Sequence, residues 1–203
     1  FAQGFAEGAG FGWNLFAPPR FSWPELMGRV HAEVARLEGV YSTTLLRAGV
    51  ALHADRAVLE DANTVALVGN GERFRARQIL IATGAVPQMV PAIPGGAFAS
   101  SSNDVFDWPE QPRRVVVQGA GYIALEFACL LRRLGSDVTV VLRGERVLRG
   151  FDDEVREHLQ SQLERQGIAF VTRAALAVIE PRRDGLTVTL DSGRVLNANA
   201  VLR

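Results

Sequence analysis

Cysteine is almost absent from this sequence of 203 residues, because Cys129 is the single example. One cysteine excludes a disulfide within the chain and any Cys-x-x-Cys metal or redox motif among these residues. Net charge is absent too, since 22 basic and 22 acidic side chains balance, so no overall field favours nucleic acid or an anionic membrane. Long apolar runs and a signal-peptide pattern are also missing, which argues against a membrane protein and favours a cytoplasmic one.

Histidine is scarce as well. The three histidines, His31, His53 and His158, show no metal-ligand or catalytic-triad spacing. We therefore expect no metal site. Cys129 stands among apolar residues of a predicted helix and is interpreted as a core residue rather than a nucleophile. The remaining composition, 48% hydrophobic and 22% charged, is typical of an ordinary globular protein.

The first half of the chain predicts one long helix and several short strands. Ser22 followed by Glu25 is a capping box, and an apolar stripe at helical spacing comes after it, so a helix is expected over residues 23–47. Gly49 fits the stop signal after a helix. Short strands are expected at residues 51–52, 56–59 and 64–68, with a Gly-Asn-Gly turn leading into another. The apolar run at residues 78–83 (QILIAT) predicts a strand buried on both faces.

The second half of the chain alternates strands with helices. Residues 85–112 are rich in proline and predict a linker. Strands are then expected at residues 115–118, 137–143, 168–171, 176–180, 187–190 and 200–202, and helices at residues 122–134 and 152–166. This alternation predicts an α/β fold with a parallel sheet, and the last strands belong to a three-stranded meander. We expect a domain boundary at the linker, with residues 1–112 on one side and 113–203 on the other.

A glycine-rich motif carries the first specific chemical signal. It consists of Gly119, Ala120, Gly121, Tyr122, Ile123 and Ala124. It comes after a predicted strand and opens a predicted helix, which is the context of the G-x-G-x-x-A dinucleotide fingerprint of Rossmann-like domains. Gly119 allows the tight turn, Gly121 lets a diphosphate approach the backbone, and Ala124 lets the helix pack against the sheet. The plainer alternative is a glycine-rich turn between packed elements.

The end of the second strand of this unit indicates which nucleotide is bound. NAD sites usually place Asp or Glu there to bind the ribose 2′-hydroxyl. This sequence has Arg143, with Arg146 and Arg149 shortly after it. A guanidinium can hold a 2′-phosphate through charge-assisted hydrogen bonds, whereas a carboxylate would repel it. The pattern therefore favours NADP over NAD, and the alternative is a solvated basic loop.

Three segments in combination resemble the glutathione reductase family of class I pyridine nucleotide-disulfide oxidoreductases. They are residues 79–87 (ILIATGAVP), 119–127 (GAGYIALEF) and 142–152 (LRGERVLRGFD). The resemblance implies a flavoprotein that passes hydride from NADPH to FAD and then electrons through a redox-active cysteine pair to glutathione disulfide. It also implies a homodimer with a role in cell redox homeostasis. Residues 1–112 would then be part of the FAD-binding domain, and residues 113–203 the NADPH-binding domain.

The resemblance also assigns roles to single residues. Tyr122 matches the aromatic side chain that covers the flavin and moves when nicotinamide enters, and Glu126 matches the carboxylate that contacts the nicotinamide carboxamide. Without the resemblance, both would be interpreted as ordinary residues of a helix start. Arg143 and Arg149 match the pair that holds the 2′-phosphate. Gly144 departs from the His or Lys often found there, and Arg146 could compensate. Candidates on the FAD side are Thr83, Gly84, Ala54 and Asp55.

Several relatives share this pattern and differ in their substrate. They are the trypanothione, mycothiol and mercuric reductases, and lipoamide dehydrogenase, against which the arginines argue. In the family, the first FAD loop and the Cys-x4-Cys pair would precede Phe1, and a His-Glu pair would come after Arg203, so we expect the native chain to be longer. A hypothesis of another class is that these 203 residues alone form a non-catalytic NADP-binding fragment.

Overall fold

The computed structural model describes residues 2–13, 17, 20–88 and 92–203. Its chain divides into two units, one made of Phe1–Met27 with Pro87–Arg203 and the other of Gly28–Val86. Near the start of the chain lie a short helix α1 (Ala2–Gly8) and a 3-10 turn η1 (Ala9–Phe11). Within the described ranges, no helix is both long and apolar enough to cross a membrane.

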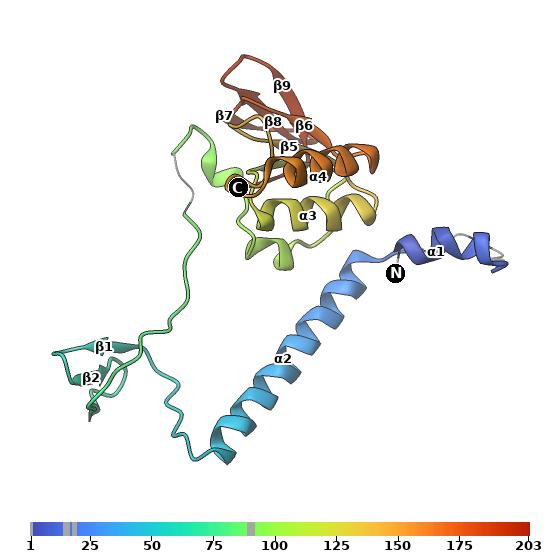
Figure 1. The fold of residues 1–203 in the computed structure, drawn as a ribbon. Helices are drawn as coiled ribbons and strands as arrows, with labels where there is room; N and C mark the ends of the chain where they lie inside the picture. Colours follow the sequence, from blue (N-terminus) through green and yellow to red (C-terminus); the bar gives the residue numbers. More distant parts are fainter. Residues whose placement is uncertain (1, 14–16, 18–19, 89–91) are drawn as a thin grey trace. The chain divides into compact units, whose positions relative to one another are not determined.

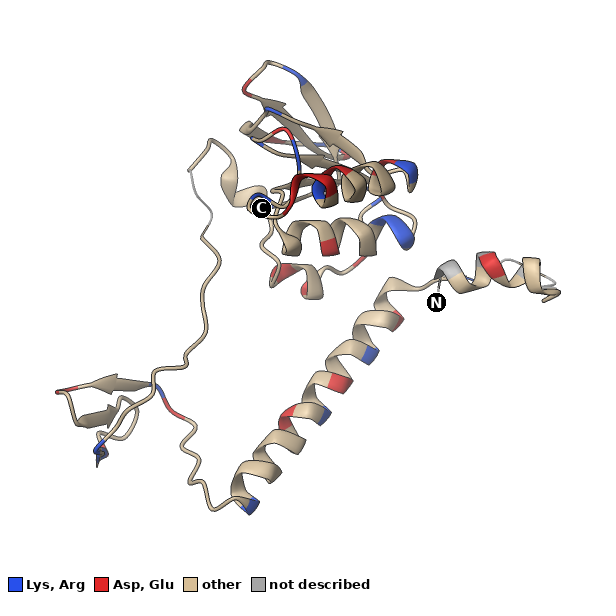
Figure 2. Ribbon diagram, viewed as in Figure 1, with Lys and Arg blue, Asp and Glu red and all other residues tan. Residues whose placement is uncertain are grey.

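Helix α2 confirms the long helix predicted from the apolar stripe, and it runs over Trp23–Arg47. The Ser22 hydroxyl accepts the backbone N–H of Glu25 at 3.4 Å, which is one half of the predicted capping box. Acidic and basic side chains are interspersed along the helix (Figure 2), as expected for a face in contact with solvent. Beyond its last turn, Gly49 adopts φ 78°, the left-handed conformation that ends many helices.

The unit of residues 28–86 contains a small antiparallel sheet in the order β1-β2-β3 (Figure 1). Its strands are β1 (Ala57–Leu59), β2 (Thr64–Leu67) and β3 (Arg73–Arg75). Ala66 and Leu67 of β2 are its buried residues, and the predicted glycine turn joins β2 to β3. The prediction of a strand at residues 51–52 is wrong, because these residues are irregular and exposed.

The predicted buried strand over residues 78–83 does not form. Its backbone is irregular, and the side chains of Leu80 and Ile81 are 90% and 67% exposed. A strand buried on both faces needs a partner on each edge to satisfy its N–H and C=O groups. No strand among the described residues pairs with this segment. The apolar pattern alone therefore does not create a strand here.

A four-stranded parallel sheet in the order β10-β4-β5-β6 organises the other unit, and its strands β5 and β6 are labelled in Figure 1. Its strands are β4 (Arg114–Gln118), β5 (Asp137–Val141), β6 (Ala169–Val171) and β10 (Ala200–Leu202). Helix α3 (Tyr122–Arg133) joins β4 to β5, and α4 (Asp153–Arg165) joins β5 to β6. This confirms the predicted α/β fold with its strand–helix alternation.

The two faces of this sheet pack against different layers because successive side chains of a strand point to opposite sides. Val115 and Val117 belong to the hydrophobic cluster that includes the buried residues of α3 and α4. Val116 belongs to a second cluster with the antiparallel meander. The meander consists of β7 (Leu176–Arg182), β8 (Gly185–Leu190) and β9 (Val195–Ala198). The sequence pattern located β7 and β8 but missed β9, and the last predicted strand, residues 200–202, is β10 of the parallel sheet rather than part of the meander.

The segment before β4 is more than a linker, because part of it packs into the core. It contains two 3-10 turns, η2 (Gly96–Phe98) and η3 (Asp104–Asp107). Val105 is 1% exposed, and the indole N–H of the buried Trp23 donates to the backbone oxygen of Trp108 at 2.9 Å. The fully buried Ser136, just before β5, donates its hydroxyl to the backbone oxygen of Pro112 at 2.7 Å. Proline content therefore predicted irregular backbone correctly but not its burial.

Candidate nucleotide-binding site

A cavity of about 630 Å³ lies at the carboxyl ends of β4 and β5. In open α/β sheets this edge is where ligands bind. The glycine-rich loop, the segment after β5, helix α4 and the end of β10 all contribute to its wall. Its charged lining consists of Arg143, Arg146, Arg149, Arg156 and Arg203. The sequence contains no lysine, and no described carboxylate lines the cavity, so its positive charge comes from guanidinium groups alone.

The glycine-rich loop leaves β4 in a conformation that only glycine adopts readily. Gly119 has φ 138°, and its N–H donates to the backbone oxygen of Val141 at 3.0 Å. A Cβ added there would stand 3.3 Å from the Cβ of Ala124, closer than most such contacts. The turn is therefore tight, and the small side chain of Ala124 is what allows the helix to approach it, as the fingerprint predicts.

The N-terminus of α3 is open to a ligand. Gly121 is its N-cap, with φ −81° and ψ 173°, and no side chain caps the helix. The N–H groups of the first turn have no acceptor within the helix, and they form the positive end of its dipole. A Cβ added to Gly121 would meet nothing within 4 Å. The first turn contains no acidic residue. This arrangement fits a diphosphate, which needs donors, positive potential and space.

The arginine loop, residues 143–149, continues from β5 and is tied to the glycine-rich loop. The N–H of Leu148 donates to the backbone oxygen of Ala120 at 2.7 Å. Arg143 and Arg149 are both exposed, and neither forms an ion pair with a carboxylate among the described residues. Arg146, in contrast, pairs with Glu157 at 3.0 Å. The two arginines predicted to hold a 2′-phosphate are therefore the available ones.

Tyr122 and Glu126, the predicted catalytic residues, lie one turn apart at the start of α3. Both are exposed, Tyr122 to 67%, and the spacing of four residues puts them on one helix face. Neither lines the cavity. Their accessible side chains could contact a ligand that extends past the glycine-rich loop.

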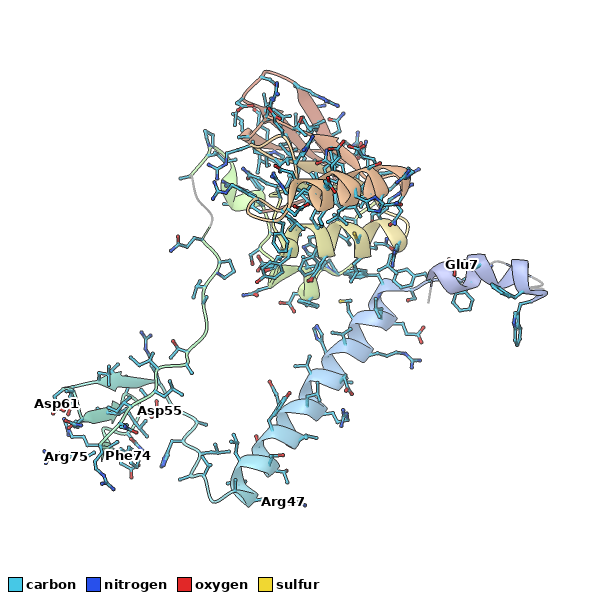
Figure 3. All side chains as sticks on the ribbon, in the orientation of Figure 1. Glu7, Arg47, Asp55, Asp61, Phe74 and Arg75 are labelled. Carbon is cyan, nitrogen blue, oxygen red and sulfur yellow. The ribbon has the colours of Figure 1, made fainter. Side chains whose placement is uncertain are left out.

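The predicted residues on the FAD side belong to the other unit. Thr83 and Gly84 are exposed, as are Ala54 and Asp55. The carboxylate of Asp55, labelled in Figure 3, accepts the backbone N–H of Gly69 at 3.0 and 3.1 Å. Asp55 therefore has a local structural role in this unit, because its carboxylate holds the turn between β2 and β3 by hydrogen bonds.

Four polar residues of the cavity wall were not predicted from the sequence, namely Gln88, Gln118, Arg156 and Arg203. Arg203 donates its Nε to the side-chain oxygen of Gln118 at 2.6 Å, and burial lowers the pKa of this guanidinium. Gln118 ends β4, and Arg203 comes directly after β10. Because β10 and β4 are parallel neighbours, both residues lie at the same edge of the sheet. Predicting this strand pairing from the sequence would therefore have brought the two residues together. Arg156 lies on α4, and its place in the wall depends on how that helix packs, for which the sequence has no local signal.

The residues interpreted as structural stay outside the site. Cys129 is half-buried on α3 against the core, and burial raises the pKa of its thiol. His53 packs its ring against Phe74, with ring centres 4.5 Å apart. In the part of the chain that the structure describes, no group of His, Cys, Asp and Glu could hold a metal ion.

Comparison with known proteins agrees with this geometry. The pyridine nucleotide-disulphide oxidoreductase family matches residues 5–203. Glutathione reductase of Burkholderia cepacia is 42% identical over 202 residues, which cover 100% of this chain and 44% of that protein. Glutathione reductase of a Nostoc species is 36% identical over 187 residues, 92% of this chain and 40% of that protein. The chain thus spans less than half the length of these relatives.

A solved structure shows the same fold. LpdA of Mycobacterium tuberculosis superposes with a TM-score of 0.86 at 24% identity, and the match covers 99% of this chain and 45% of LpdA. The family match extends over almost the whole chain and includes both the glycine-rich loop and the arginine loop. The chain therefore belongs to the pyridine nucleotide-disulphide oxidoreductase family.

Proposed function

We propose that the protein is an NADPH-dependent flavoprotein disulfide reductase of the glutathione reductase type, and that the cavity binds NADPH. The observation that carries the proposal is the combination of an uncapped helix N-terminus with a cavity wall of arginines and no described carboxylate. A diphosphate and a 2′-phosphate are the two anionic groups of NADPH, and each has a matching element here.

The residues of this chain would divide the binding between them. The first-turn N–H groups after Gly121 would hold the diphosphate, while Arg143 and Arg149 would hold the 2′-phosphate. Tyr122 and Glu126 would face the nicotinamide, with Tyr122 shielding the flavin until the nucleotide enters. NADPH and FAD, when bound, supply the hydride and electron transfer that amino-acid side chains cannot perform.

The remaining features of the proposal concern the rest of the molecule. Residues 113–203 would form the NADPH-binding domain and residues 1–112 part of the FAD-binding domain, with Thr83, Gly84, Ala54 and Asp55 on the FAD side. Glutathione disulfide would be the substrate, and the protein would act as a cytoplasmic homodimer. The identity to two glutathione reductases supports this substrate.

Replacement of the two arginines tests the nucleotide assignment. Arg143→Ala with Arg149→Ala removes two charge-assisted contacts of roughly 1.5–3 kcal/mol each. NADPH affinity should fall on the order of a hundredfold or more, with NADH affinity little changed. Arg182→Ala with Arg183→Ala is a matched control, because it removes the same charge from the exposed end of β7 and the turn that follows it. Equal losses for NADPH and NADH would refute the assignment.

The redox part of the proposal needs a separate measurement. The purified protein should show flavin absorbance and should oxidise NADPH when glutathione disulfide is added. Tyr122→Gly should leave NADPH binding intact and change flavin fluorescence. A preparation that binds NADPH but carries no flavin and reduces no disulfide would instead support the alternative, a non-catalytic nucleotide-binding fragment.

A further inference from the structure

Helix α4 holds the middle of the arginine loop by two side chains that lie one turn apart. The Nε of Arg156 donates to the backbone oxygen of Val147 at 2.8 Å. The side-chain oxygen of Gln160 accepts a hydrogen bond from the backbone N–H of Val147 at 3.3 Å. The side chain of Val147 is itself fully buried in the core. Both backbone polar groups and the side chain of this one residue are therefore fixed.

Arg156 is in turn held in place by its own helix. Its Nη1 pairs with Asp153 at 2.5 Å, and its Nη2 donates to the backbone oxygen of Arg146 at 3.4 Å. Its side chain is only 18% exposed. The helix start is fixed as well, because Asp152 accepts the N–H groups of two first-turn residues. All three guanidinium nitrogens thus have partners within the protein, although the residue lines the cavity.

The loop needs such support because its backbone is strained. Leu148, directly after Val147, has φ 51°, a left-handed conformation that costs on the order of 1–3 kcal/mol for a residue of this kind. Strain of this size persists only where the surroundings enforce it. Two contacts enforce it here: α4 holds the neighbouring Val147, and the backbone N–H of Leu148 donates a hydrogen bond to Ala120.

We propose that Arg156 and Gln160 are positioning residues that set the preference for NADPH over NADH. By fixing Val147 they hold the loop so that Arg149, two residues on, faces the same cavity as Arg143. The inference rests on the proposed NADPH binding and deepens it. Arg156 acts through the loop rather than on the nucleotide, because its three nitrogens are already engaged.

The test compares Arg156→Gln with Arg165→Gln, which removes the same charge from the exposed last turn of the same helix. The purified protein and both variants are titrated with NADPH and with NADH. In Arg156→Gln the dissociation constant for NADPH should rise about tenfold, while that for NADH changes less than about twofold. Arg165→Gln should match the unsubstituted protein with both nucleotides.

Hydrogen exchange separates positioning from direct contact. Without nucleotide, the amides of residues 146–149 should exchange faster in Arg156→Gln than in the control variant, because the loop has lost its clamp. Gln160→Leu should have the same effect on exchange and on NADPH affinity, and Arg156→Lys, which keeps a donor and the charge, should restore part of both.

Two failures can be told apart. If the unsubstituted protein does not prefer NADPH, the proposed function is overturned together with this inference. If it prefers NADPH and Arg156→Gln keeps that preference, or loses both nucleotides equally, only the positioning role is overturned. Unchanged exchange at residues 146–149 with weaker NADPH binding would also overturn it, because the side chain would then contact the nucleotide directly.

Discussion

Replacing Gly121 by serine should make the protein slightly more stable and a poorer binder of nucleotides. Gly121 has an ordinary extended conformation and open space where a Cβ would stand, so serine fits without strain. Serine is a better N-cap than glycine because its hydroxyl accepts an N–H of the first helical turn. That N–H is one of the donors proposed to bind the diphosphate. In Gly121→Ser the serine hydroxyl therefore occupies a hydrogen-bond donor of the helix that the nucleotide would otherwise use.

The magnitudes come from the two roles of this N–H group. An improved N-cap contributes a few tenths of a kcal/mol, which should raise the melting temperature by about 1 °C in a chain of this size. A ligand that loses one hydrogen bond to a charged group loses roughly 1.5–3 kcal/mol, so affinity should fall at least about tenfold. NADPH and NADH should be affected equally, because both contain the diphosphate.

Gly119→Ala is the matched contrast for this prediction. At φ 138° and with a 3.3 Å approach to Ala124, alanine is strained. A cost of about 2 kcal/mol would lower the melting temperature by about 4–8 °C. Thermal melts monitored by circular dichroism give the melting temperature of each variant, and titrations with NADPH and NADH give its affinity for each nucleotide. The proposed binding of the diphosphate at the N-terminus of α3 is refuted if Gly121→Ser binds both nucleotides like the unsubstituted protein, or if it weakens NADPH alone.

Three further predictions concern groups outside the cavity. Ser136→Ala should cost about 1–3 kcal/mol in urea unfolding, because the buried backbone oxygen of Pro112 loses its donor; an unchanged midpoint would contradict this. Hydrogen bonds from the N–H and hydroxyl of Ser101 lower the pKa of Asp104. The ionised carboxylate therefore stabilises the fold at pH values above the ordinary pKa of an aspartate, and this stabilisation is lost as the pH falls through the lowered pKa. Asp104→Ala should therefore melt earlier at neutral pH, with a difference that disappears in strong acid. Burial raises the pKa of Cys129, so maleimide labelling in mild alkali should be slower than for a free thiol and should become fast on unfolding.

Features encoded by adjacent residues could be predicted from the sequence. Helix α2 begins after Ser22 and ends before Gly49, and both signals act through backbone groups within a few residues. The glycine-rich loop was also predictable, because Gly119 and Ala124 are five residues apart and meet within one turn of chain. Arg143 could be placed near the site because, in this fold, the residues directly after the second strand lie at the ligand-binding edge of the sheet.

Features that depend on distant partners could not be predicted in this way. The apolar run at residues 78–83 has the composition of a central strand, yet a strand also requires neighbours, and none is present among the described residues. The hydrogen bond between Leu148 and Ala120 joins two backbone groups, so no pattern of side chains in the sequence predicts it. The same holds for Arg156, whose sequence environment is that of any amphipathic helix while its three nitrogens hold a loop and the helix start.

The placement of β10 beside β4 has a consequence for the order in which this fold can assemble. Val201 pairs with Val116 across 85 residues, and its side chain is fully buried. Contacts at such separation form slowly, because a long loop must close before they stabilise anything. The strands β4, β5 and β6 can pair while the chain is still being made, but the meander and β10 must come later. Nascent chains should therefore pass through a stage in which β4 is an unpaired edge, the state in which association with another chain competes with folding.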